Sequence, residues 1–262
     1  MKKPKFTIIP VPYEATVTYG KGTRKGPAAI LKALPHVEEF DEEQKCEIFD
    51  IAEIQILKPV PLPGLEPRVN GLIKNGNIPV VLGGEHSITV RVIKAVAEKY
   101  KNLSVLQLDS HADLRDHYKG SKYNHACTMR RVLEICPAVQ VGIRNISKWG
   151  YEYATKTGQI DKIHWAEKLE LTEKIENQLS KNVYITIDVD VFDPSVIPAT
   201  GTPEPGGMFW YEVLDVLKGV CATKNVVGFD VMELSPRKGE IASDFAAAKL
   251  VYKIMGFIST KS

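Results

Sequence analysis

The chain has 262 residues, of which 44% are hydrophobic and 25% charged, so it is long enough to bury one large core. The formal charge of +2 comes from Lys and Arg scattered among Asp and Glu, which gives no electrostatic argument for nucleic acid. No stretch approaches the roughly 18 apolar residues of a membrane span, and the basic start has no apolar region behind it. The four cysteines form no CxxC pair, which is typical of reduced thiols. We therefore expect a single domain, 1–262, that is cytoplasmic and acts on a small molecule.

Apolar runs that alternate with amphipathic segments predict about eight strands and as many helices. The predicted strands are Phe6–Ile9, Cys46–Ala52, Ile78–Leu82, Ser104–Leu108, Ala138–Ile143, Lys162–Trp165, Val183–Ile187 and Asn225–Phe229. The predicted helices are Ala28–Leu34, Leu65–Asn75, Ser87–Tyr100, Thr128–Ile135, Ser147–Thr157, Ala166–Leu179, Tyr211–Cys221 and Asp244–Ile258. This alternation predicts an α/β protein with a mostly parallel, buried sheet. An open sheet and a TIM barrel both fit, and both place sites at the carboxyl ends of strands.

One predicted strand end carries three potential metal ligands, Asp109, His111 and Asp113. Residues at i, i+2 and i+4 of an extended chain point to one side at steps of roughly 6.6 Å, and they can converge once the strand curls into a loop. Buried carboxylates need a neutralising partner. The spacing favours a cation site over a solvated loop that merely contains these residues.

Two further strand ends supply the same kinds of side chain. His86 follows the glycines that end Ile78–Leu82, and Asp188 and Asp190 follow Val183–Ile187. The six candidate ligands are His86, Asp109, His111, Asp113, Asp188 and Asp190. Their four carboxylates match the charge of two divalent ions, and oxygen ligands with some imidazole suit manganese. Two such ions about 3.5 to 4 Å apart can lower the pKa of a shared water.

Asp188 and Asp190 also resemble the motif of haloacid-dehalogenase-type phosphatases, in which the first Asp is the nucleophile. That motif normally opens its domain, whereas here it lies late in the chain. It also leaves His86 and the Asp109 segment unexplained.

Four motifs in order resemble the ureohydrolases, the arginase and agmatinase family. They are Gly83–Ser87, Asp109–Asp113, Asp188–Pro194 and Gly228–Glu233, with further similarity at Tyr13–Pro27 and Thr200–Gly207. The resemblance implies a three-layer αβα sandwich and a trimer or hexamer with two Mn²⁺ per subunit. All six ligands and Glu233 are retained, which argues against a non-catalytic metal-binding relative.

The resemblance also implies a role for each site residue. His86, Asp109, Asp113 and Asp188 would hold one metal, and Asp109, His111, Asp188 and Asp190 the other, with Asp109 and Asp188 bridging. A metal-bridging hydroxide would attack the guanidinium carbon and release urea and an amine. Glu233 would bind the guanidinium, and His125 would pass a proton to the departing amine. We accordingly expect His125, Asp113 and Glu233 to be catalytic.

Three residues bear on the choice of substrate. Arginases use an Asn two residues after the last Asp of the metal segment to bind the α-carboxylate, and here Arg115 stands in that place. An exposed guanidinium could instead bind a carboxylated substrate such as formiminoglutamate. The run that includes Asp116 looks more like agmatinases, and Asp116 would meet a primary amine, although a helix-capping role or pairing with Arg115 is an equal alternative. Phe209 replaces a hydroxyl that relatives often carry near the guanidinium glutamate. The leading hypothesis is an agmatinase that makes putrescine and urea. N1-aminopropylagmatine ureohydrolase, arginase and formimidoylglutamase remain alternatives.

Overall fold

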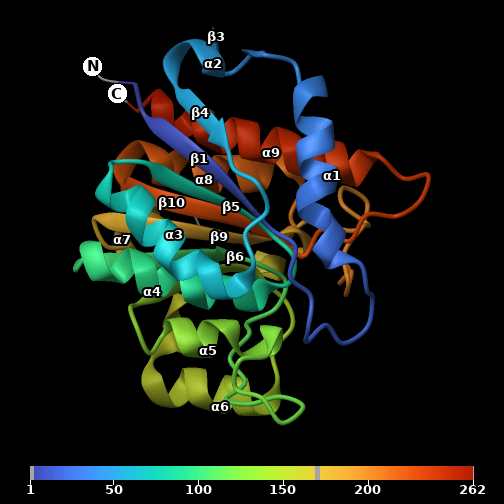
Figure 1. Ribbon diagram of the computed structural model, residues 1–262. Helices are drawn as coiled ribbons and strands as arrows, with labels where there is room; N and C mark the ends of the chain where they lie inside the picture. The colour runs from blue at the N-terminus through green and yellow to red at the C-terminus, as the bar shows by residue number, and fades with distance from the viewer. Residues whose placement is uncertain (1–2, 169–171, 262) are drawn as a thin grey trace.

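The computed structural model describes residues 3–168 and 172–261 and is built on one eight-stranded sheet. Its strands lie in the order β4-β1-β5-β10-β9-β6-β7-β8, and every neighbouring pair is parallel. The bounds are β1 Lys5–Val11, β4 Glu53–Ile56, β5 Ile78–Gly83, β6 Leu103–Leu108, β7 Ala138–Ile143, β8 Ile163–Trp165, β9 Asn182–Asp188 and β10 Asn225–Met232. The sheet is open, with β4 and β8 at its edges, so the sandwich expectation is confirmed and the barrel is excluded (Figure 1).

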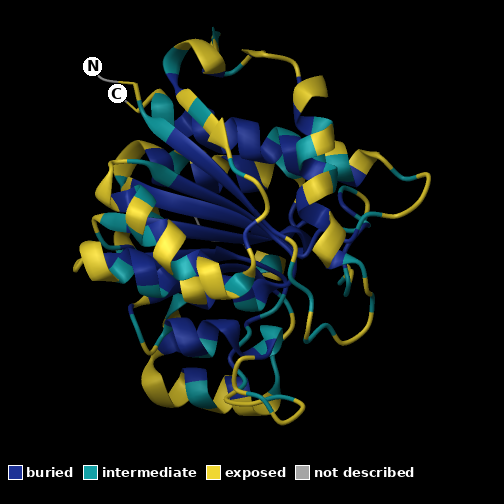
Figure 2. Ribbon diagram, in the orientation of Figure 1, coloured by how far each residue is buried: buried dark blue, intermediate teal, exposed yellow. Residues whose placement is uncertain are grey.

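Helices cover both faces of the sheet and make it the middle layer of three (Figure 1). One face is covered by α1 Gly26–Ala33, α7 Thr172–Gln178, α8 Trp210–Thr223 and α9 Ala242–Ser259. The other is covered by α3 Leu62–Lys74, α4 Thr89–Lys99, α5 Thr128–Val132 and α6 Lys148–Thr157. Ile8 packs in the first layer of core and its neighbour Ile9 in the second, because successive strand residues point to opposite faces. The central strands are therefore buried throughout, as Figure 2 shows.

The predicted strand Cys46–Ala52 is wrong. Cys46–Glu47 forms β3, which pairs antiparallel with β2 (Phe40–Asp41) in a separate two-stranded sheet. Ile48–Ile51 then forms a helical turn, α2, and the sheet strand β4 begins only at Glu53. The tertiary contacts explain this difference, since Ile48 is fully buried and its N–H donates to the Tyr252 hydroxyl of α9 at 3.0 Å. The predicted helix Ala166–Leu179 is observed as Ala166–Lys168 and α7, and 169–171 lie outside the described residues.

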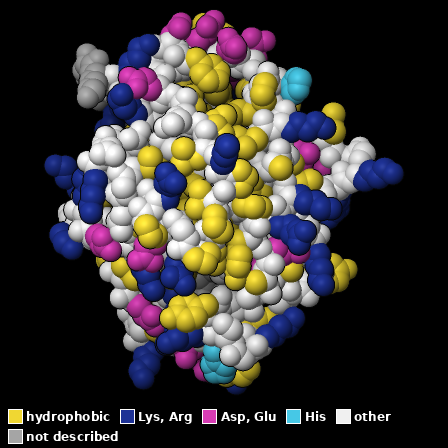
Figure 3. All heavy atoms as spheres, in the orientation of Figure 1, with side chains coloured by type: hydrophobic (Ala, Val, Ile, Leu, Met, Phe, Trp, Pro, Cys, Tyr) yellow, Lys and Arg dark blue, Asp and Glu magenta, His cyan; other side chains and the backbone are white. Residues whose placement is uncertain are grey.

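The surface carries mixed charges. On the face drawn in Figure 3, apolar side chains run down the middle from top to bottom, and cationic and anionic side chains are interspersed around them. No helix in the described ranges has both the length and the apolar character needed to cross a bilayer.

The strand order explains how the motifs meet. β5, β10, β9 and β6 are consecutive neighbours at the centre of the sheet. Their carboxyl ends carry, in the same order, His86, Glu233, Asp188 and Asp109. Because all four strands are parallel, the motifs lie side by side at the carboxyl-terminal end of the sheet, where open α/β folds bind their ligands.

Gly84 should not tolerate a side chain. A Cβ there would lie 1.9 Å from the backbone oxygen of Tyr13. We expect Gly84→Ala to lower the free energy of unfolding by more than about 2 kcal/mol, because backbone atoms cannot move aside as a side chain can. Gly71→Ala is the matched control, since nothing lies within 4 Å of its Cβ and helix α3 should gain up to about 1 kcal/mol. Urea denaturation measures both, and equal stability of the two variants would contradict the prediction.

Candidate active site

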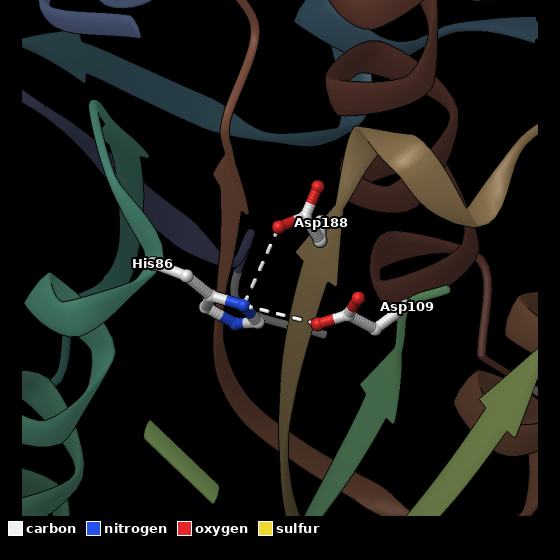
Figure 4. Close-up of side chains that lie close together, drawn as sticks. All are labelled: His86, Asp109 and Asp188. Atoms are coloured by element: carbon white, nitrogen blue, oxygen red, sulfur yellow. Dashed lines mark ion pairs between the residues drawn. The ribbon is translucent and has the colours of Figure 1, made fainter. Parts of the chain in front are cut away.

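Three ligand candidates gather around the ring of His86, which lies at the end of β5. Its Nδ1 is 3.1 Å from Asp109 Oδ2, 3.5 Å from Asp188 Oδ2 and 3.6 Å from Asp113 Oδ2. Figure 4 shows Asp109 and Asp188 directing their carboxylates toward this one nitrogen from neighbouring strand ends. His86, Asp109 and Asp188 offer ligand atoms close enough together to hold one ion.

A second group surrounds His111. Its Nδ1 lies 2.9 Å from Asp190 Oδ2 and 3.7 Å from Asp109 Oδ1. Asp109, His111 and Asp190 again offer ligand atoms within reach of one ion. The two groups share Asp109, so the structure brings all six candidates together, and Asp109 stands where the resemblance places a bridging ligand.

The carboxylates are oriented by hydrogen bonds. Asp109 accepts from the His111 backbone N–H at 2.6 Å and from Gln107 Nε2 at 2.6 Å. Asp190 accepts from the Ser110 N–H at 3.0 Å, and Asp188 from the Asp190 N–H at 3.0 Å. These bonds fix the oxygens before any ligand binds, which is what a preorganised metal site requires.

The tautomer of His86 follows from its partners. Thr186 Oγ1 donates to Asp230 Oδ1 at 2.6 Å, so the same oxygen accepts from His86 Nε2–H at 2.9 Å. In the neutral ring Nδ1 therefore carries the lone pair, and this buried atom has no hydrogen-bond partner among the described residues. An orphaned imidazole nitrogen that faces three carboxylates fits a metal ion, because a neutral His is the ligand form.

The electrostatics of the candidate ligands also fit bound cations. Burial raises the pKa of Asp188 well above its usual value, and Asp190 and Asp109 raise it further. The pKa of Asp113 is raised well by burial and by Asp109. Burial alone would lower the pKa of His111, but Asp190 and Asp109 outweigh it and raise that pKa to about 12. These raised pKa values mean that bound protons reduce the negative charge of the group, and divalent cations would do so in their place.

Two of the predicted site residues have strained backbones. Asp113 has φ 51° and Glu233 has φ 64°, a left-handed region that residues with a Cβ rarely adopt. Glu233 is held there by its N–H, which donates to the Gly84 carbonyl at 2.8 Å, and its Oε1 accepts from the His86 N–H at 2.7 Å. Such strain costs about 1–3 kcal/mol and is typical of residues held in place for function.

These residues line one cavity of about 230 Å³. Its wall includes Glu233, His125 and five of the ligand candidates, which are His86, His111, Asp113, Asp188 and Asp190. His125 begins a short 3-10 helix, His125–Cys127, in the segment after β6, and burial lowers its pKa. The ring is therefore neutral near physiological pH and can accept a proton.

The tail residues are placed less uniformly. Asp116 does not line this cavity; its Oδ1 accepts from Arg131 at 2.6 Å, which is the pairing alternative with a different arginine. Arg115 does line the cavity, and its guanidinium lies over the rings of Tyr118 (4.7 Å) and Trp149 (5.9 Å). Phe209 is exposed at the N-terminus of α8 and is not part of the wall.

Several supporting residues were missed from the sequence. Gln107 and Thr186 are fully buried polar residues inside apolar strands, and that interruption is the signal that could have revealed them. Asp230, which the sequence marks only as part of the motif Gly228–Glu233, accepts from Thr186, Thr89 and Tyr184 and so holds His86. Glu85 was treated as part of a motif, with no role of its own.

An open parallel sheet with two overlapping His–Asp groups at its strand ends is the architecture of a metal-dependent enzyme. The sequence profile of the Arginase family matches residues 4–256. The chain belongs to the arginase family, and the expectation of a ureohydrolase, a hydrolase of guanidino C–N bonds, is confirmed at that level. The phosphatase interpretation of Asp188 is thereby excluded.

Individual relatives agree with this assignment. The chain is 36% identical to the N(1)-aminopropylagmatine ureohydrolase of Synechocystis, over 95% of this chain and 88% of that protein. It is 33% identical to the agmatinase of Pyrococcus horikoshii, over 98% and 93%. Among solved structures, the agmatine ureohydrolase of Thermoplasma volcanium is similar with a TM-score of 0.85 and 27% identity, over 98% and 91%.

Metal removal should make stability depend on pH. The pKa values of Asp113 and Asp188 are raised in the folded protein above their ordinary 3.8. Their contribution to the free energy of unfolding is therefore fully present below pH 3.8 and is lost as pH rises through the raised values. The raised pKa values of His86 and His111 also make the protein less stable as pH rises above 6.5. The lowered pKa of Asp109 has the opposite effect on stability, but only below pH 3.8. EDTA-treated protein should therefore become less stable as pH rises.

Manganese should reverse that loss. We expect Mn²⁺ at about 100 times its dissociation constant to add about 2.7 kcal/mol. The gain should grow with pH, because protons compete with the metal for its ligands. Thermal unfolding between about pH 5 and pH 9, with Mn²⁺ or EDTA, measures this. A manganese effect that is absent, or identical at every pH, would rule out these ligands.

Proposed function

We propose that the protein is a manganese-dependent ureohydrolase of amine-tailed guanidines, with two Mn²⁺ per subunit and agmatine as the leading substrate. Agmatine would yield putrescine and urea. The observation that carries this proposal is that five of the six ligand candidates, all but Asp109, line the same small cavity as Glu233. A guanidinium paired with Glu233 would lie directly beside the metal ligands.

Each residue has a distinct part in the proposed reaction. His86, Asp109, Asp113, Asp188, His111 and Asp190 would hold the metals, which when bound lower the pKa of a water enough to make it a nucleophile. Glu233 would pair with the guanidinium and fix its carbon in the path of attack. Asp113, which lies 3.6 Å from His86 Nδ1, would accept hydrogen bonds from the attacking water.

His125 would complete the proton balance. Breakage of the C–N bond leaves an amine nitrogen that needs a proton before it can depart. A neutral imidazole on the cavity wall can take up a proton as water adds and deliver it to that nitrogen. The net reaction consumes one water and releases urea and the amine.

N1-aminopropylagmatine is the second candidate, and the similarity to the Synechocystis enzyme favours it. The guanidinium of Arg115 is stacked on Tyr118 and Trp149, which holds it beside the rings and leaves its charge intact. Assembly into a trimer or hexamer and a cytoplasmic location stay predictions.

A substrate panel tests the tail. With Mn²⁺ present, urea release should be measured for agmatine, N1-aminopropylagmatine and arginine. For formiminoglutamate, the release of formamide should be measured. We expect kcat/KM for the two amine-tailed compounds to exceed that for the other two by at least about tenfold. The reason is that position 115 is Arg and not the Asn with which arginases bind the α-carboxylate. A preference for arginine or formiminoglutamate would overturn the choice of substrate.

Glu233→Gln tests the guanidinium contact. The amide keeps an acceptor for the His86 N–H but removes the negative charge. We expect kcat/KM to fall by about 100-fold or more, because a charge-assisted pair is replaced by a neutral one. Glu212→Gln, a change at the exposed start of α8, is the control. Unchanged kcat/KM in Glu233→Gln, at full metal content, would refute the assigned role.

A further inference from the structure

Glu85 is a fully buried carboxylate beside the site, and the proposed reaction does not use it. Its Oε2 accepts from the backbone N–H groups of Ala15 (2.5 Å) and Thr16 (2.6 Å). Its Oε1 accepts from the hydroxyls of Thr16 (2.8 Å) and Ser87 (2.5 Å). Four donors therefore converge on one carboxylate, and they tie the loop after β1 to the end of β5.

The Thr16 hydroxyl lies between this carboxylate and His125. Thr16 Oγ1 is 3.1 Å from His125 Nδ1 and accepts from the His125 backbone N–H at 3.0 Å. Residues 16 and 125 belong to two loops 109 positions apart in the chain. One hydroxyl thus fixes both the backbone and the ring of His125.

The direction of each hydrogen bond follows from a count of protons. A carboxylate only accepts, so the single hydroxyl proton of Thr16 must point to Glu85. The Thr16 oxygen then has only lone pairs to offer His125, and the contact with Nδ1 requires an N–H on that nitrogen. Nε2 is left with the lone pair.

We propose that Thr16, oriented by Glu85, is a positioning residue that fixes His125 as the Nδ1–H tautomer and leaves Nε2 as the atom that takes up and returns the proton. This inference rests on the proposed function, in which His125 serves the departing amine. It assigns a catalytic purpose to the first loop, which contributes none of the six metal ligands.

The environment of His125 makes the tautomer consequential. Burial lowers the pKa of the ring, so the neutral form, which has two tautomers, is the one present. In solution the Nε2–H form of a neutral imidazole is generally the commoner, and that form has no lone pair on the nitrogen the reaction needs. The Thr16 contact would reverse this preference.

Kinetics of Thr16 variants test the proposal. Thr16→Val removes the hydroxyl with little change of shape and should lower kcat by roughly tenfold to a hundredfold, with KM and manganese content unchanged. Thr16→Ser keeps the hydroxyl and should retain kcat within about threefold. Thr7→Val is the matched control, because Thr7 is a buried threonine at the amino end of β1 whose hydroxyl bonds to Asn77.

Two kinetic outcomes would overturn the proposal. One is a wild-type kcat in Thr16→Val. The other is an equal loss of kcat in Thr16→Ser or Thr7→Val, which would mean that altered packing and not the hydroxyl is responsible.

A spectroscopic experiment is independent of turnover. Long-range ¹H–¹⁵N correlation of ¹⁵N-histidine protein, loaded with diamagnetic Zn²⁺, distinguishes the two tautomers, and His125→Gln identifies the resonance. We expect Nδ1–H in the wild type and a shift toward Nε2–H in Thr16→Val. An Nε2–H form in the wild type would refute the proposal. Failure of every compound in the substrate panel would instead count against the proposed function, and the spectrum would still decide the tautomer.

Discussion

The cost of burying negative charge is the constraint on which this structure depends. Asp109, Asp188 and Asp190 are at most 5% exposed, and all three stand at the carboxyl ends of central strands. Backbone and amide donors orient them without neutralising them. A parallel sheet brings such strand ends together, so only cations or bound protons can make the arrangement stable. The raised pKa values of Asp113 and Asp188 show that protons can neutralise these carboxylates, and two divalent ions would neutralise them instead when bound.

A hydroxyl between a carboxylate and an imidazole occurs twice at this site. Thr186 stands between Asp230 and His86, and Thr16 between Glu85 and His125. In each case the carboxylate takes the hydroxyl proton, and the oxygen then selects which imidazole nitrogen bears hydrogen. The results differ in purpose. His86 presents Nδ1 to the ligand group, whereas His125 presents Nε2. In the proposed function, the same local chemistry would therefore serve metal binding in one place and proton transfer in the other.

The central strands and the six ligand candidates could be predicted from the sequence because their signals are local. Apolar runs ended by Gly83 or Asp188 mark buried strands, and the i, i+2 spacing marks one side of a strand end. Cys46–Ala52 could not be read correctly, since its conformation depends on Tyr252, some 200 residues away. The same limit applies to Asp116, whose partner Arg131 lies on another segment, and to Thr16, an ordinary loop threonine until Glu85 and His125 are placed beside it.

The site divides into a floor and a mouth with different constraints. The floor consists of strand ends whose positions are set by the sheet register, and Arg144 reinforces it by donating to the carbonyls of Asp190 (2.7 Å) and Glu204 (2.8 Å). The mouth consists of loops, including the one that carries Arg115. Changes in loops alter shape and charge without disturbing buried carboxylates. The proposed metal chemistry would therefore be tied to the fold, whereas the choice of substrate tail would depend on the loops that surround the site.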